Sequence, residues 1–158
     1  MGNKFPKAKK TNITIPIQKC YLLTRYRSIL VKDNSSRKID MDFLIKSSLS
    51  SREYIIKIKY DTIYDIPKVF LLNENLPIYQ NEKIPHIYGY KKINGKDYVR
   101  LCTYFPKEDW NNKMIIANTV FLWTIEWIYF FEIWSVSGKW CGRWDTSRRG
   151  RSKRRKCR

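Results

Sequence analysis

Cys102 is the residue of this chain with the clearest chemical potential. It lies in the segment Val99-Arg100-Leu101-Cys102-Thr103-Tyr104, with Arg100 two residues before it. On an extended strand both side chains would share one face, and a neighbouring guanidinium stabilises a thiolate and lowers the thiol pKa. The thiolate is the nucleophilic form of cysteine. Free cysteine is also one of the most often buried residue types, so a purely structural Cys102 is the competing interpretation.

The polar residues nearest to Cys102 in the chain suggest partners for it. His86 is the only histidine, and Tyr88 follows it by two residues. Stabilising a tetrahedral intermediate requires donors aimed at the oxyanion, and the Tyr88 hydroxyl, the Asn94 amide or backbone N–H groups would serve. The sequence does not choose among them. A cysteine–histidine protease would need a third orienting residue, and no pattern supplies one, so we expect His86 to be a hydrogen-bonding structural residue.

The other cysteines indicate the compartment and the absence of a metal. Cys20, Cys141 and Cys157 lie far apart and form no C-x-x-C pair. With one histidine in the chain, no zinc-type spacing arises, and we expect neither metal nor cofactor. The basic N-terminus is not followed by an apolar stretch, so no signal peptide is predicted. These features favour the cytoplasm, where thiols remain reduced.

The order of these residues resembles the active-site region of ubiquitin-conjugating (E2) enzymes. That region runs from a His-Pro-Asn motif through a short hairpin to a cysteine followed eight residues later by tryptophan. Here His86, the turn Asn94-Gly95, Cys102 and Trp110 stand in that order, with Trp110 eight residues after Cys102. The similarity is residue by residue from 85 to 110 and by element order from about 17 to 136. The Asn of the motif has no match, and the loop before Cys102 is longer.

A narrower resemblance is to stand-alone E2-like proteins of bacterial anti-phage (CBASS) operons, which also encode cGAS-like nucleotidyltransferases. It rests on the series Pro85-His86-Ile87-Tyr88, Leu101-Cys102, Trp110, the aromatic run 123–134 and Gly138-Lys139-Trp140. The resemblance implies a cysteine transferase in which Cys102 accepts an acyl group, the C-terminus of that nucleotidyltransferase, as a thioester and passes it to a lysine. The alternatives are a non-catalytic E2-like interaction module and a basic protein that binds nucleic acid or a membrane surface.

The elements that would position these residues form an α+β domain. We expect an amphipathic helix over 17–31 and a β-meander of strands 39–45, 54–60 and 69–72, the second of which alternates apolar and lysine residues. A long loop over 73–85 follows. Asn94-Gly95 predicts a tight hairpin turn between 88–93 and 98–104, and 106–112 a further turn. The stretch 114–136 predicts one long aromatic-rich helix.

That aromatic helix must be weighed as a membrane span. Its apolar run contains Glu126 and Glu132. Each central acidic residue raises the free energy of membrane insertion by roughly 2.5–3.5 kcal/mol, whereas each Leu or Phe lowers it by only roughly 0.3–0.6 kcal/mol. A membrane span is therefore disfavoured. A helix that is apolar nearly all round must be covered or leave an adhesive patch, which predicts a buried helix, a homodimer or a partner protein.

The charge of the chain lies mostly at its two ends. The net charge is +18, from 32 basic and 14 acidic residues, and nine Arg or Lys lie within 143–158. Clustered cations bind phosphates, so nucleic-acid binding through this tail is possible, although a solubilising tail has the same composition. The expected organisation is a flexible basic arm over 1–12, a single E2-like domain over 13–142 and a disordered basic tail over 143–158.

Overall fold

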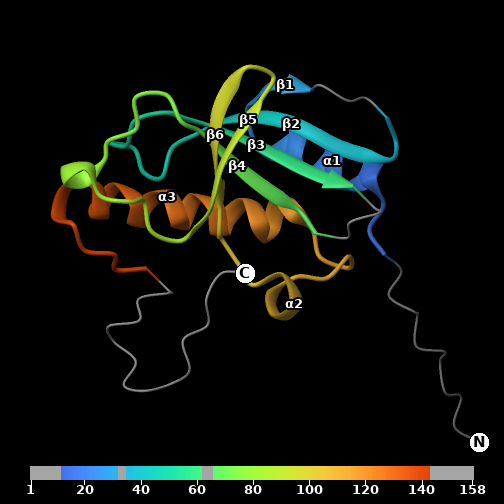
Figure 1. Cartoon of the computed structure of the whole chain (residues 1–158). Helices are drawn as coiled ribbons and strands as arrows, with labels where there is room; N and C mark the ends of the chain where they lie inside the picture. The colour runs from blue at the N-terminus through green and yellow to red at the C-terminus, as the bar shows by residue number, and fades with distance from the viewer. Residues whose placement is uncertain (1–11, 32–34, 62–65, 143–158) are drawn as a thin grey trace, which may run out of the picture.

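The fold is a layer of helices packed on one antiparallel sheet (Figure 1). The structure is a computed structural model, and it describes residues 12–31, 35–61 and 66–142. The six strands lie in the order β1-β2-β3-β4-β6-β5. The strands are β1 (Ser28–Val31), β2 (Lys38–Ile45), β3 (Tyr54–Asp61), β4 (Lys68–Leu72), β5 (Ile87–Ile93) and β6 (Lys96–Leu101). The helices are α1 (Ile15–Arg25), η1 (Tyr79–Asn81), α2 (Pro106–Asp109), η2 (Ile116–Asn118) and α3 (Val120–Ser137). This confirms the α+β class and the predicted order of helix, meander, loop and final helix.

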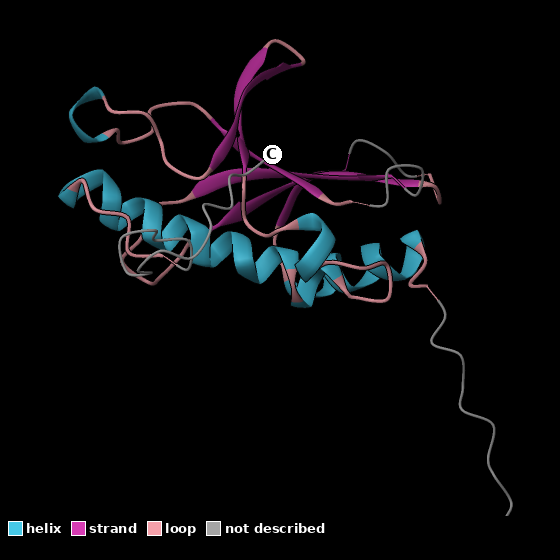
Figure 2. Ribbon diagram, turned by 60° about the horizontal axis from the view of Figure 1, so that its bottom comes forward, coloured by secondary structure: helices cyan, strands magenta, loops and turns pink. Residues whose placement is uncertain are grey.

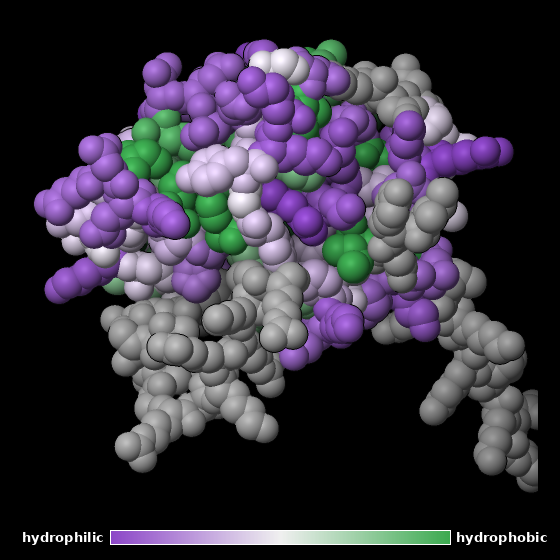
Figure 3. Space-filling view, in the orientation of Figure 1, coloured by the Kyte–Doolittle hydropathy of each residue, from purple (hydrophilic) through white to green (hydrophobic). Residues whose placement is uncertain are grey.

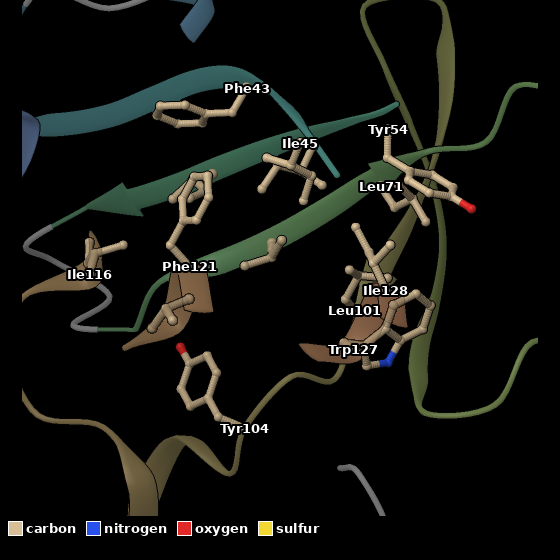
Figure 4. Close-up of a cluster of buried hydrophobic side chains, with 14 of the residues drawn as sticks. Phe43, Ile45, Tyr54, Leu71, Leu101, Tyr104, Ile116, Phe121, Trp127 and Ile128 are labelled. Atoms are coloured by element: carbon tan, nitrogen blue, oxygen red, sulfur yellow. The ribbon is translucent and has the colours of Figure 1, made fainter. Parts of the chain in front are cut away.

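The helices α1, α2 and α3 all lie on one side of the sheet, as Figure 2 shows. The strand residues that point toward them form the hydrophobic core, because alternate side chains of a strand face the same side. In β2 and β3 the pair Phe43 and Ile56 is fully buried on this side. The ring of Phe121 from α3 meets Phe43 edge-on at a centroid distance of 5.2 Å. Figure 4 shows this core, with side chains of the strands and of α3 meeting across the layer.

The first helix is shorter than the sequence predicts. It ends at Arg25, and Ser28–Val31 forms the edge strand β1 against β2, so the predicted helix over 17–31 is wrong beyond residue 25. Tyr26 explains the change of direction. Its ring stacks on Phe121 at 3.5 Å, and its hydroxyl donates to the Ala117 carbonyl at 2.7 Å. The Ile29-Leu30-Val31 run that follows suits a strand.

The aromatic helix begins later than the sequence predicts. Residues 116–118 form the short 3₁₀ turn η2, and α3 starts only at Val120. Thr119 interrupts the two with φ −129° and ψ −86°. At the other end Gly138 adopts φ +69°, and its N–H donates to the Trp134 carbonyl at 2.8 Å, as in a glycine-terminated helix. Among the residues that the structure describes, no helix is long and apolar enough to cross a membrane.

The β5–β6 hairpin rises from the side of the sheet opposite the helices (Figures 1 and 2). Its turn confirms the prediction from Asn94-Gly95: both residues have positive φ, 50° and 78°, as a two-residue hairpin turn requires. Because β6 pairs with β4, the base of the hairpin joins the meander. The end of β6 that leads to Cys102 is thereby held by strands on both sides.

Candidate functional site

Cys102 is the first residue after β6. Its N–H donates to the His86 carbonyl at 3.0 Å, which extends the contact between the bases of β5 and β6 by one residue. The predicted strand to Tyr104 is wrong beyond Leu101, where β6 ends. The Cys102 side chain is 1% exposed. The Cys102 sulfur takes part in a disulfide, so the expectation that the thiols stay reduced is wrong for this residue. The structure therefore anchors the backbone of the candidate nucleophile firmly and covers its side chain.

His86 holds this position through its backbone. Its φ of 52° lies in the left-handed region, and its carbonyl accepts two hydrogen bonds, from the Cys102 N–H at 3.0 Å and from Trp127 Nε1 at 3.1 Å. The imidazole packs on the ring of Trp140 at a centroid distance of 4.8 Å. The loop before β5 is thus attached to both the cysteine and the long helix α3.

An aromatic cluster made of His86, Trp127, Phe130 and Trp140 forms the floor under this loop. Trp140 lies 5.5 Å from the ring of Trp127 and 6.2 Å from that of Phe130. The Trp140 Nε1 atom is buried and has no hydrogen-bond partner among the described residues. Sequence reasoning did not identify Trp127 as a hydrogen-bond donor, because nothing in the aromatic run distinguishes it from its neighbours. Only the fold places it under His86.

Tyr88 occupies a β-bulge in β5. The register shifts between Ile87, opposite Leu101, and Gly89, opposite Arg100, and a bulge redirects the side chain of its extra residue. The Arg100 guanidinium lies 4.5 Å above the Tyr88 ring. Burial raises the pKa of Tyr88, and the charge of Arg100 opposes that rise. The hydroxyl therefore remains protonated at neutral pH and able to donate.

A small open pocket lies beside these residues. Its volume is about 10 Å³, enough for about one water molecule. Tyr88, Arg100 and Thr103 line it together with Ile66, Pro67, Lys68, Val69, Leu101, Tyr104 and Pro106. The Thr103 hydroxyl is buried without a hydrogen-bond partner among the described residues, a feature that the sequence did not indicate. Polar donors thus gather on the segment that immediately flanks Cys102.

Two of the five residues predicted for the site lie elsewhere. Asn94 stands at the tip of the β5–β6 hairpin, and the length of β6 separates it from Cys102 by roughly 17 Å at the usual rise of a strand. Trp110 is 6% exposed in the core and meets Tyr60 edge-on at 6.0 Å. The structure brings His86 and Cys102 together and places Tyr88 near them. It places Asn94 far from Cys102, and it packs Trp110 in the hydrophobic core.

The described residues contain no group of three or more His, Cys, Asp or Glu side chains that could hold a metal ion.

Comparison with known proteins adds a family to this geometry. The family model described as "Type II CBASS E2 protein" matches residues 18–147 of the 158. A search of the curated proteins finds no match. The matched range contains the whole sheet, the loop at His86, Cys102 and the long aromatic helix.

Proposed function

This chain belongs to the Type II CBASS E2 family and has a role in CBASS anti-phage defence, and we propose that it is a cysteine acyl transferase in which Cys102 carries the acyl group as a thioester. The proposed acyl donor is the C-terminus of the nucleotidyltransferase encoded in the same kind of operon, and the proposed acceptor is a lysine amine. The observation that supports this most is the double hydrogen bonding of the His86 carbonyl, which orders the backbone at Cys102.

The proposed reaction has two steps. Before the first step, a cellular thiol reduces the disulfide at Cys102 and is itself oxidised to a disulfide. The Cys102 thiolate then attacks the carbonyl carbon of an activated donor, an acyl adenylate or a thioester. A C–S bond forms, and the bond to the leaving group breaks with its electron pair. A lysine amine then attacks the thioester, so that a C–N bond forms and the C–S bond breaks. The electron pair returns to the Cys102 sulfur, and a base takes the amine proton.

The residues near Cys102 offer support for the negative charge that develops in both steps. A donor aimed at the oxyanion typically contributes a factor of about 10² to 10³. The Tyr88 hydroxyl is the donor that we propose, because its raised pKa keeps it protonated and its bulge lies next to the pairing of Ile87 with Leu101. His86 has a positioning role through its carbonyl. Asn94 is not part of this proposal.

The burial of Cys102 favours a second candidate, the non-catalytic E2-like interaction module. A side chain that is 1% exposed and disulfide-bonded is reached by a donor only after the disulfide is reduced and a neighbouring segment moves. Alkylation of the folded protein with a small haloacetamide under reducing conditions separates the two. Transferase activity requires Cys102 to react at a rate well above that of global unfolding. A Cys102 that reacts only on unfolding would support the module.

Adduct formation with the operon's nucleotidyltransferase tests the proposal itself. Purified together with an activating reagent or enzyme, the two proteins should form a covalent adduct on a non-reducing gel. Hydroxylamine should cleave it, because hydroxylamine attacks thioesters and spares disulfides. Cys102→Ala should form no adduct.

Two matched variants control for the general loss of a thiol. Cys20 and Cys141 are exposed free thiols, so Cys20→Ser and Cys141→Ser should retain the adduct. If Cys102→Ala formed the adduct as well as the natural chain, the transferase proposal would be wrong.

A further inference from the structure

The disulfide at Cys102 narrows the choice of its partner within this chain. The chain contains four cysteines, and Cys102 is disulfide-bonded. Cys20 and Cys141 are free thiols. Cys157, which lies outside the described residues, is the remaining cysteine, and it stands next to the last residue of the sequence. A bond between the two would join the proposed nucleophile to the C-terminal end of its own chain.

The last described residues lie beside the loop that anchors Cys102. After α3, Trp140 packs on the His86 ring at a centroid distance of 4.8 Å, and the His86 carbonyl accepts the Cys102 N–H at 3.0 Å. Gly142 is buried against this cluster, so that a Cβ on it would lie 2.7 Å from Trp140 Nε1. The C-terminal tail, residues 143–158, therefore starts close to the proposed nucleophile.

The tail is long enough to reach Cys102. Cys157 follows Gly142 by fifteen positions, and an extended chain spans at most about 3.3–3.6 Å per residue, or roughly 50 Å over this length. Because the tail starts in the aromatic cluster under the His86 loop, only a fraction of that span is needed.

A covalent bond is the means by which such a tail stays at the site. The net charge of the chain is +18, and nine of its 32 basic residues lie in the tail, so the tail and the rest of the chain are both positive and repel each other. On the face that Figure 3 shows, hydrophilic residues dominate and apolar ones form small separate patches, so burial of apolar surface offers little attraction there. Reduction of the bond would therefore release the tail.

The residues around Cys157 suit a disulfide that forms and breaks. Lys156 and Arg158 flank it, and three further basic residues occupy 153–155. Neighbouring cations stabilise a thiolate, and the thiolate is the form of cysteine that attacks a disulfide. Cys102, in contrast, is 1% exposed. The end of the chain thus supplies the reactive partner of a buried cysteine.

We propose that Cys157 pairs with Cys102 and that this disulfide blocks the nucleophile reversibly. This inference rests on the proposed function and specifies its regulation. While the bond is present, the Cys102 sulfur is not a thiolate and does not attack a carbonyl carbon. Reduction restores both thiols, and charge repulsion then separates the tail from the site.

The exchange needs a small disulfide such as glutathione disulfide. The Cys157 thiolate attacks one of its sulfurs, so that a mixed disulfide forms and one glutathione leaves. The Cys102 thiolate then attacks the Cys157 sulfur, the protein disulfide forms, and the second glutathione leaves. Two protein thiols are oxidised, one small disulfide is reduced to two thiols, and the protons of the protein thiols pass to glutathione. Two reduced glutathione molecules reverse both steps.

Peptide mapping tests the pairing without any activity. The natural chain is treated with glutathione disulfide at low protein concentration, alkylated, and digested with trypsin without reductant. The peptide that contains Cys102 should carry the mass of the dipeptide Cys157-Arg158 less two hydrogen atoms. The inference is overturned by a Cys102 that is alkylated as a free thiol or joined to any other cysteine, and equally by a disulfide-linked dimer on a non-reducing gel.

The rate at which an acetyl thioester acylates Cys102 tests the block. In about 0.1 mM reduced and about 0.01 mM oxidised glutathione, the natural chain should react about tenfold more slowly than in excess reductant, because the two cysteines of one chain have a high effective concentration. Cys157→Ser can form only a mixed disulfide with glutathione, so its rate should stay within about twofold of its rate in excess reductant. A Cys157→Ser variant slowed as much as the natural chain would contradict the proposal.

Cys141→Ser is the matched control, because it removes an exposed free thiol near the same end of the chain and should behave as the natural chain does. The two measurements also separate this inference from the proposed function. If the acetyl thioester acylates Cys102 equally fast in both buffers, the block is overturned while the function stands. If Cys102 is not acylated even in excess reductant, the proposed function fails and the block with it, whatever the peptide map shows of the pairing.

Discussion

At the scale of single residues, a backbone carbonyl rather than a side chain organises the candidate site. The His86 carbonyl accepts hydrogen bonds from Cys102 and from Trp127, so the strand end, the loop and the long helix meet at one oxygen. In the ubiquitin-conjugating motif an asparagine supports this loop. Here Tyr88 stands at that position, and the indole of Trp127 supplies a donor from below the loop.

Replacing Trp127 with Phe tests this arrangement. Trp127→Phe keeps an aromatic ring in the cluster but removes the Nε1 donor to the His86 carbonyl. We expect a loss of about 1 kcal/mol in the free energy of unfolding and slower acylation of Cys102. Denaturant unfolding measures the change in the free energy of unfolding. The rate at which an acetyl thioester acylates Cys102 measures the change in acylation.

Trp123→Phe is the matched control, because the Trp123 ring packs on Tyr104 at 5.5 Å and gives no hydrogen bond to His86. It should lower stability by a similar amount and leave the acylation rate nearly unchanged. Equal acylation rates in Trp127→Phe and the natural chain would contradict a positioning role for Trp127.

Local sequence predicted Cys102, His86 and Tyr88 as neighbours because a hairpin turn at Asn94-Gly95 returns the chain to its start. It did not predict Trp127, Trp140 or Thr103. Their roles depend on how α3 crosses under the sheet, which is a matter of tertiary packing and leaves no periodic signal. Asn94 was proposed for its amide alone, and the same turn that brings the strands together carries it to the far tip.

At the scale of elements, the end of α3 depends on a glycine. Gly138 has φ +69°, and a Cβ there would collide with the ring of Tyr79 in η1. Gly138→Ala should therefore cost about 1–2 kcal/mol for the left-handed backbone and more for the collision. Thermal unfolding measures the loss.

Gly95→Ala is the comparison for this prediction. Gly95 also has positive φ, 78°, but a Cβ there meets nothing within 4 Å, so only the backbone cost applies. A Gly138→Ala protein as stable as Gly95→Ala would mean that α3 and the loop at η1 do not pack as described.

The buried lysine of β3 makes a second prediction at this scale. Lys57 is 0% exposed and pairs with Asp42 and Asp40. Burial alone would lower the pKa of Lys57, but the hydrogen bond and the charge of Asp42, with the charge of Asp40, raise it above the usual value. Because a raised lysine pKa stabilises the folded state below the unfolded pKa, this contribution is present at neutral pH and is lost in strongly alkaline solution.

Lys57→Met should destabilise the fold by about 3–5 kcal/mol, because it leaves Asp42 buried without its partner. The double change Lys57→Met with Asp42→Leu should recover a large part of the loss, since it also removes the unpaired charge. Urea unfolding of both variants at neutral pH checks this. A double variant less stable than Lys57→Met alone would contradict the account.

The alternation of β3 predicted its strand and its inward face correctly, because period-two patterning depends only on which side is buried. It could not predict that Lys57 on the other face would also be buried. That follows from the pairing of β2 with β3, which places Asp42 opposite Lys57. The predicted end of the first helix was wrong for a similar reason. Residues 28–31 have mixed local preferences, and the open edge of β2 decides their structure.

At the scale of the whole molecule, the described residues form one sheet with one helical layer, and the family match extends from residue 18 to 147. We propose the region 13–142 as the single domain, with basic segments before and after it. The predicted arm over 1–12, apart from Asn12, and the predicted tail over 143–158 lie outside the described residues. The exposed apolar residues of α3, Leu122, Tyr129 and Val136, recur every seven residues, and a partner through this helix remains a prediction.

Removing residues 143–158 tests the domain proposal and the nucleic-acid alternative together. In the presence of a reductant, the shortened chain should unfold within about 3 °C of the full chain, because the core of the part that the structure describes lies before Arg143. Its affinity for single-stranded nucleic acid should fall, with a weaker dependence on salt, because nine cations are removed. Calorimetry measures the unfolding temperature, and a salt titration measures the affinity and its dependence on salt. Unchanged affinity and salt slope would exclude the tail as the binding element.

The central claim is that Cys102 forms a thioester with the donor's C-terminus. The most direct measurement is mass spectrometry of the adduct with the operon's nucleotidyltransferase, digested under mildly acidic, thiol-free conditions. The account predicts that the peptide containing Cys102 gains the mass of the donor's C-terminal peptide less one water, and that hydroxylamine removes the gain. An unmodified Cys102 in an adduct joined at another residue would contradict it.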